Sequence, residues 1–96
     1  MRKSKSIIVD DMEHCYVCGS PYIQIHHCIY GVANRKLSDK YGLVVPLCCE
    51  HHTGNAGVHR NKDLDLHLKK LSQEAFERKY GARNEFIRVF GRNYLD

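Results

Sequence analysis

The chain has 96 residues, and its 15 Lys and Arg against 11 Asp and Glu give a formal net charge of +4. A chain of this length forms one small domain with a limited core, which a bound structural metal would stabilise further. No apolar run is long enough to cross a bilayer or to form the core of a signal peptide, so we expect a cytoplasmic protein with a mild preference for polyanions.

Residues 1–12 are predicted to be a short basic N-terminal segment, and residues 13–96 a single domain. The basic residues of the segment could contact phosphates or belong to a frayed terminus. The domain begins with a Cys-x-x-Cys pair, Cys15 and Cys18, followed by Gly19, which permits the left-handed backbone of a metal-binding turn. The same pair could be a redox dithiol, but that motif follows a strand and begins a helix, and neither is evident here.

Two strands are predicted next, joined by a loop into a hairpin. Residues 22–30 are rich in β-branched and aromatic residues that alternate in character, and His26 and His27 lie near the end of this strand. Residues 31–40 are polar and basic with no clear period, which is typical of a loop. Residues 41–45 form a second apolar strand, which Pro46 is expected to end.

Three helical segments complete the chain. After Cys48, a helix or tight turn carries the next two histidines, until the Gly-rich residues 53–57 interrupt it. A longer helix begins at Asn61, which can cap it, and Gly81 can close it. Its apolar residues recur at helical spacing: Leu64, Leu68, Leu71 and Ala75.

The last helix covers about residues 84–90 and ends at Gly91. It presents Phe86, Ile87 and Phe90 on one side. We expect these two C-terminal helices to be the packing layer of the domain, and His67 on the longer one to be a surface residue.

The spacing of cysteine and histidine predicts a structural zinc site. Tetrahedral zinc takes four protein ligands, and two pairs separated by two residues can close such a site from distant segments. The pairs here are Cys15 with Cys18 and Cys48 with His51. Cys49 could replace Cys48, although only Cys48 has the two-residue spacing to His51. Folding is then expected to depend on the metal.

Four histidines remain for a second site: His26, His27, His52 and His59. Several imidazoles beside a basic loop suit a catalytic divalent cation that acts on a phosphodiester, because one neutral His can take a proton from water while the ion offsets phosphate charge. Adjacent residues of a regular strand point to opposite faces, so His26 and His27 can share a site only if the strand ends or twists there.

These residues resemble the zinc-stapled form of the HNH, or His-Me finger, nuclease superfamily. The resemblance rests on Cys15-x-x-Cys18, Ile25-His26-His27 and Leu47-Cys48-x-x-His51-His52. Residues 33–36, 43–48 and 57–59 are similar to small phage and prophage proteins of the recombination-enhancement, RecA-dependent nuclease type. The implied fold is α+β, a zinc-stapled ββα-metal core with two C-terminal helices. The implied setting is the cytoplasm of a bacterial host cell, with a phage or prophage gene.

The resemblance also implies roles for individual residues. His27 would be the general base, His26 and His52 would be ligands of a catalytic Mg²⁺ or Mn²⁺, and His59 would be a further ligand or a phosphate contact. The family's asparagine on the second strand is replaced here by Gly42-Leu43, so Asn34 is the candidate for its orienting role.

The function that we expect is metal-dependent hydrolysis of DNA phosphodiesters. The candidate phosphate contacts are Arg35, Lys36 and Arg60. DNA would be the substrate, and a RecA-type filament a further partner.

Two other functions remain open from the sequence. A zinc-stapled module without catalysis could bind DNA or a recombination protein, in which case binding would be salt-sensitive and no cleavage would occur. A thiol redox protein using Cys15 and Cys18 is the third option, and tightly bound zinc would exclude it.

Overall fold

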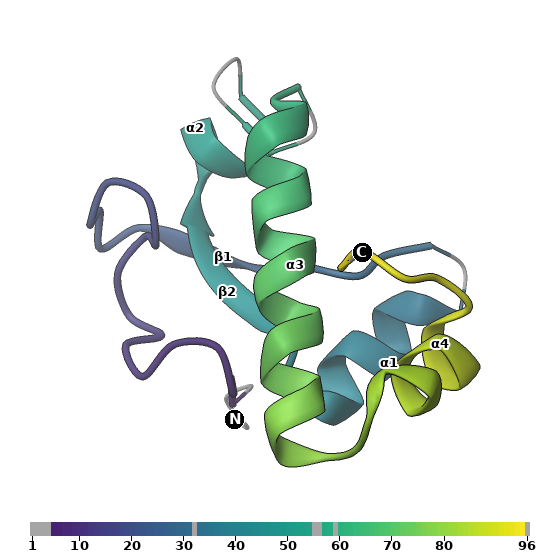
Figure 1. Ribbon diagram of the computed structural model, residues 1–96. Coiled ribbons are helices and arrows are strands. Elements are labelled where there is room, and N and C mark those ends of the chain that lie inside the picture. The colour runs from purple at the N-terminus through teal and green to yellow at the C-terminus, as the bar shows by residue number, and fades with distance from the viewer. Residues whose placement is uncertain (1–4, 32, 55–56, 59, 96) are drawn as a thin grey trace.

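The computed structural model describes residues 5–31, 33–54, 57–58 and 60–95 (Figure 1). This part of the chain is α+β, with one two-stranded antiparallel sheet and four helices. The elements in chain order are β1 (Ile23–His27), α1 (Asn34–Tyr41), β2 (Val44–Cys48), α2 (Cys49–His52), α3 (Lys62–Lys79) and α4 (Arg83–Phe90). Within the described residues, no helix has the length and apolar character needed to span a bilayer.

The hairpin of β1 and β2 is present, but its second strand lies further along the chain than expected. The register pairs Ile23 with Cys48 and His27 with Val44, and every residue of β2 is buried. The prediction that Pro46 ends this strand is wrong, because Pro46 lies at its centre. Its carbonyl accepts a hydrogen bond from the Tyr16 N–H at 2.8 Å. In a strand the backbone N and O of one residue face the same side, so the nitrogen of Pro46, like its carbonyl, faces away from β1. The lack of an N–H at Pro46 therefore removes no hydrogen bond between β1 and β2.

The segment predicted to be a loop, residues 31–40, instead contains α1. This helix ends at Gly42, whose φ of 74° is left-handed and whose N–H reaches the carbonyls of Ser38 and Asp39. Tertiary contacts hold it in place, since the buried Ser38 hydroxyl accepts the Ile29 N–H at 3.1 Å and donates to the Ile29 carbonyl. A helix this short is marginal by itself, so its sequence carries little helical signal.

The two C-terminal helices form the expected packing layer. Asn61 caps α3, because its side-chain oxygen accepts the Leu64 N–H at 3.1 Å. The helix α3 ends at Lys79 with Tyr80 as its cap, and Gly81 follows at the predicted end, where its N–H donates to the Phe76 carbonyl at 3.4 Å, although its φ is not left-handed. Gly91, with a φ of 77°, ends α4 as predicted.

A cluster of aromatic and aliphatic side chains joins α3 and α4 to the rest of the chain. Its buried members are Ile29, Leu43, Phe76, Phe86 and Phe90. Phe86 and Phe90 point inward as predicted, but Ile87 does not share their environment and is 39% exposed. In Figure 1, α3 crosses the hairpin, and α1 and α4 lie side by side beyond one end of the hairpin. His67 lies on the exposed side of α3, as predicted.

Candidate metal centre and histidine hollow

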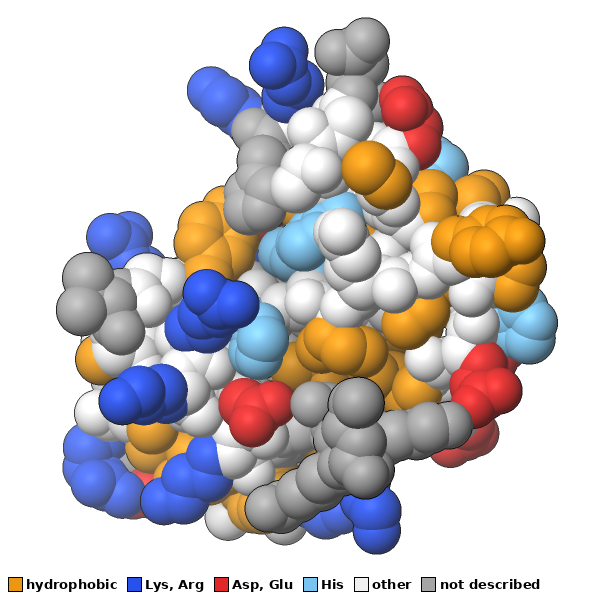
Figure 2. Space-filling model, turned by 180° about the vertical axis from the view of Figure 1, so that it is seen from behind, with side chains coloured by type: hydrophobic (Ala, Val, Ile, Leu, Met, Phe, Trp, Pro, Cys, Tyr) orange, Lys and Arg blue, Asp and Glu red, His pale blue; other side chains and the backbone are white. Residues whose placement is uncertain are grey.

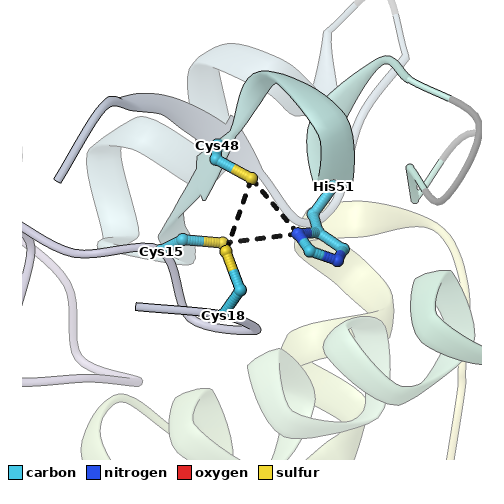
Figure 3. A group of neighbouring side chains, drawn as sticks. All are labelled: Cys15, Cys18, Cys48 and His51. Carbon is cyan, nitrogen blue, oxygen red and sulfur yellow. Dashed lines mark hydrogen bonds between the residues drawn. The ribbon is translucent and has the colours of Figure 1, made fainter. Parts of the chain in front are cut away.

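Cys15, Cys18, Cys48 and His51 meet in one cluster, with all four ligand atoms within 4.8 Å of one another (Figure 3). The Sγ atoms of Cys18 and Cys48 are 3.7 Å apart, and the Nδ1 atom of His51 lies 3.1 Å from Cys48 Sγ and 3.9 Å from Cys15 Sγ. A tetrahedral zinc with Zn–S bonds of about 2.3 Å separates its sulfur ligands by roughly 3.8 Å. The cluster therefore has the donors and dimensions of a structural zinc site.

Backbone hydrogen bonds shape the cysteine turn that enters this cluster. The Cys15 N–H donates to the Ser20 carbonyl, and the Gly19 N–H donates back to the Cys15 carbonyl at 2.9 Å. Gly19 has a φ of 79°, which confirms the left-handed turn predicted at this position. The bond from Tyr16 to Pro46 fixes the turn against β2, whose last residue is Cys48.

The cluster favours a thiolate at Cys15, one of its two buried cysteines. Burial of Cys15 opposes ionisation, but the backbone N–H groups of Cys48, Cys18 and Val17 and the Cys18 thiol together lower the pKa of Cys15 to about 6. Because thiolates are the form that binds zinc, this environment prepares Cys15 as a ligand.

The structure places the two adjacent cysteines, Cys48 and Cys49, in different surroundings. Cys48 ends β2 and faces the cluster, whereas Cys49 begins α2, is exposed, and has its Sγ 4.0 Å from the Thr53 hydroxyl. Cys48 is therefore the ligand, and the alternative of Cys49 is wrong.

A separate hollow of about 240 Å³ lies at the end of the hairpin. The described residues that line it are Ile25, His26, His27, Tyr30, Arg35 and His52. Three of the four histidines predicted for the second site therefore line the same hollow as Arg35. On the face shown in Figure 2, histidines lie near the centre, and Lys and Arg side chains gather beside them.

The end of β1 explains how two adjacent histidines reach one hollow. His27 is the last residue of β1, so the strict alternation of side chains stops there. His26 is 2% exposed, and its ring centroid is 5.3 Å from that of His52 at an interplanar angle of 71°. The requirement that the strand end at this pair is thus met.

Two further side chains orient the histidines of the hollow. The Nδ1 atom of His52 lies 2.7 Å from the Gln24 side-chain oxygen, which can only accept, so Nδ1 carries the proton. The Nε2 atom of His27 lies 3.6 Å from a carboxylate oxygen of Asp39. Each contact joins a strand residue to a residue of the helix beside it.

Sequence reasoning missed three residues around this hollow: Gln24, Tyr30 and Asp39. Gln24 shares a strand face with His26 by simple alternation, and this signal could have identified it. Asp39 carried no such signal, because it reaches His27 only when residues 34–41 are helical.

The other predicted site residues are divided between the hollow and other parts of the molecule. The Asn34 amide donates to the Phe90 carbonyl at 3.2 Å, at the end of α4. Arg35 lines the hollow, whereas Lys36 and Arg60 are exposed and are not among the described residues that line it. His59 lies outside the described residues.

No protein-family model, curated protein or solved structure matches this chain.

Proposed function

We propose that the protein is a metal-dependent DNA endonuclease of the HNH type. The observation that carries this proposal is the convergence of His26, His27 and His52 with Arg35 in one hollow. The hollow is lined by residues of β1, α1, α2 and the connection between the strands, and the Cys/His cluster lies where β2 meets α2. Two antiparallel strands followed by a short helix are the elements that the ββα-metal resemblance implies, here with α1 inserted between the strands.

The chemistry of the donors in the hollow fits a divalent cation. His26 and His52 offer imidazole nitrogens, which suit manganese or zinc better than magnesium, the harder ion that prefers oxygen. A divalent ion bound there would offset negative charge on the scissile phosphate and on the leaving oxygen.

The chain's own residues supply the proton transfer and the binding of phosphate. We place the proton of His27 on Nε2, which lies 3.6 Å from a carboxylate oxygen of Asp39, so that Nδ1 accepts a proton from the attacking water. Arg35 faces the same hollow and binds a phosphate oxygen through its guanidinium. Attack by this water in line with the leaving oxygen then breaks the phosphodiester.

The test is cleavage of supercoiled plasmid and of single-stranded circular DNA with manganese or magnesium. We expect wild type to cut and His27→Ala to lose about 10²–10⁴-fold in rate, the usual contribution of a general base. His14→Ala is the matched control, because His14 is exposed and pairs with Asp11 outside the hollow. Zinc content and circular dichroism establish that each variant is folded.

A partner is the first explanation to test if wild type does not cut. The same assay on DNA coated with a RecA-type filament would show cleavage if the filament presents the substrate. Absence of cleavage on both bare and coated DNA, by a folded and zinc-loaded protein, overturns the nuclease proposal.

One observation favours a second function, a zinc-stapled module that binds DNA without cutting it. The only candidate for the orienting asparagine, Asn34, uses its amide to hold the end of α4. Salt-sensitive binding of DNA by both wild type and His27→Ala, with no cleavage by either on bare or coated DNA, would establish this function instead.

A further inference from the structure

A second and larger hollow, which we call the groove, is lined in part by Asp39. It has a volume of about 1130 Å³ and runs between the N-terminal segment, the end of α1 and the end of α3. This volume exceeds the range of roughly 300–1,000 Å³ that is usual for small-molecule sites. An extended ligand therefore fits this groove better than a compact one.

The groove combines cations with aromatic rings. Its lining includes Lys5, Lys40 and Lys79 together with Tyr41 and Tyr80. The Lys40 ammonium lies 5.4 Å from the centre of the Tyr41 ring, and the Lys79 ammonium lies 5.9 Å from that of Tyr80. Tyr80 is 46% exposed, while its ring packs edge-on against Tyr41 at 5.1 Å. Packing therefore holds the ring of Tyr80 in place while part of it stays open to a ligand.

We propose that this groove binds single-stranded nucleic acid, an inference that rests on the proposed nuclease function and specifies its substrate. Lysines along a groove neutralise a phosphate backbone, and tyrosine rings stack on unpaired bases. A duplex buries the faces of its bases in its own stack, so it can use the lysines but not the rings. The arrangement thus selects an unpaired strand.

The groove and the histidine hollow approach each other at Asp39. Asp39 lines the groove, and its carboxylate contacts His27, which lines the hollow. A strand that lies in the groove thus passes beside the proposed general base. Asp39 and Asp10 are the two acidic residues of the groove lining, and Asp39 is turned toward His27.

The test is fluorescence anisotropy of a labelled single-stranded oligonucleotide and of its duplex, with the zinc-loaded full chain and no added magnesium or manganese. We expect wild type to bind the single strand at least tenfold more tightly than the duplex. Tyr80→Ala is expected to weaken single-strand binding by about tenfold through lost stacking. Tyr80→Phe keeps the ring, so it is expected to bind like wild type, and circular dichroism and zinc content establish that Tyr80→Ala is folded.

Matched controls lie outside the groove. Tyr22→Ala removes a tyrosine that is 84% exposed, and Lys70→Glu reverses an exposed lysine of α3, and neither residue lines the groove. Lys79→Glu should weaken binding and flatten its salt dependence, unlike Lys70→Glu. The proposal that the groove binds single strands is overturned if duplex binds as tightly as the single strand or more tightly. It is also overturned if Tyr80→Ala and Tyr22→Ala change binding equally.

Cleavage distinguishes this failure from failure of the nuclease proposal. If Tyr80→Ala cuts and binds like wild type, the groove is not the binding site for single strands, but the nuclease proposal holds. If single-strand binding depends on Tyr80 but wild type never cuts bare or coated DNA, the nuclease is wrong and the groove stands as a binding site.

Discussion

The Nε2 atom of His27 lies 3.6 Å from the Oδ1 atom of Asp39. His27 ends β1 and Asp39 belongs to α1, so the contact depends on how the connection between the strands folds. The separation is slightly too long for a hydrogen bond, but the Asp39 side chain is 56% exposed and has room to close it. In the proposed mechanism, a carboxylate in this place would keep the proton of His27 on Nε2 once the contact closes, which would leave Nδ1 to act as the base.

We predict that Asp39→Asn lowers kcat for DNA cleavage by about tenfold, because the carboxylate orients the base, and does not raise KM, because losing a negative charge from the groove lining does not weaken the binding of a polyanion. Steady-state cleavage of a labelled oligonucleotide measures both constants. Asp63→Asn changes an exposed carboxylate at the start of α3 and is expected to have no effect. A rise in KM at unchanged kcat would mean that Asp39 acts on binding and not on His27.

The neighbouring residue Ser38 fixes α1 to the end of the hairpin. Its hydroxyl satisfies both the N–H and the carbonyl of Ile29, and all three groups are buried. We predict that Ser38→Ala costs about 1–3 kcal/mol, since it leaves buried backbone groups without partners. Chemical denaturation gives this difference in the free energy of unfolding.

Ser72→Ala is the matched control for that substitution. Ser72 is equally buried, but its hydroxyl donates to the Leu68 carbonyl within its own helix, at 2.8 Å, and otherwise contacts the weakly polar Cys28 thiol. The Leu68 carbonyl belongs to the backbone hydrogen bonds of α3, so it keeps a partner when the hydroxyl is removed. We therefore expect a smaller loss of stability from Ser72→Ala than from Ser38→Ala. Equal losses for the two variants would show that Ser38 acts through packing and not through its bonds to Ile29.

Local spacing was enough to predict the zinc cluster and the C-terminal helices. Two residues separate Cys48 from His51, and one turn of α2 converts that spacing into proximity. Asn61 caps α3 through a bond three residues away, and Phe86 and Phe90 share a helical face. Each helix feature, and each of the two ligand pairs, thus depends on residues a few positions apart, whereas the two pairs themselves come from segments about thirty residues apart.

Distant contacts decided what the sequence did not predict. The helix α1 has eight residues, mostly polar, and it depends on Ser38 bonding to Ile29. Pro46 stays within β2 because its carbonyl faces the cysteine turn, thirty positions earlier in sequence, and not β1. The pairing of Asp39 with His27 depends on the position of α1 beside the end of β1. No local sequence pattern could therefore have predicted it.

Adjacent cysteines allow a sharp test of the zinc site. We predict that Cys48→Ser lowers bound zinc well below one per chain and destabilises the fold, because it removes one of four ligands. Cys49→Ser should bind one zinc with wild-type stability, since Cys49 lies exposed on α2. Atomic emission and thermal unfolding measure the two quantities. Full zinc binding by Cys48→Ser would contradict the assigned ligand set.

Gln24 provides the last test, which concerns the second metal site. Its side-chain oxygen accepts the Nδ1–H of His52 at 2.7 Å, so the lone pair of that imidazole is on Nε2, the nitrogen proposed to bind the ion. We predict that Gln24→Ala weakens manganese binding by about 10–100-fold, as is usual when the partner of a ligating histidine is lost.

Calorimetric titration of manganese into the zinc-loaded protein measures this affinity without any DNA. Gln24→Glu keeps the acceptor and adds a negative charge, so it is expected to bind manganese at least as tightly as wild type. Tyr22→Ala, two residues earlier in the chain, controls for changes to the exposed side of the hairpin. Wild-type affinity in Gln24→Ala would mean that His52 does not use the tautomer fixed by Gln24, and the role of His52 as a ligand would lose its structural basis.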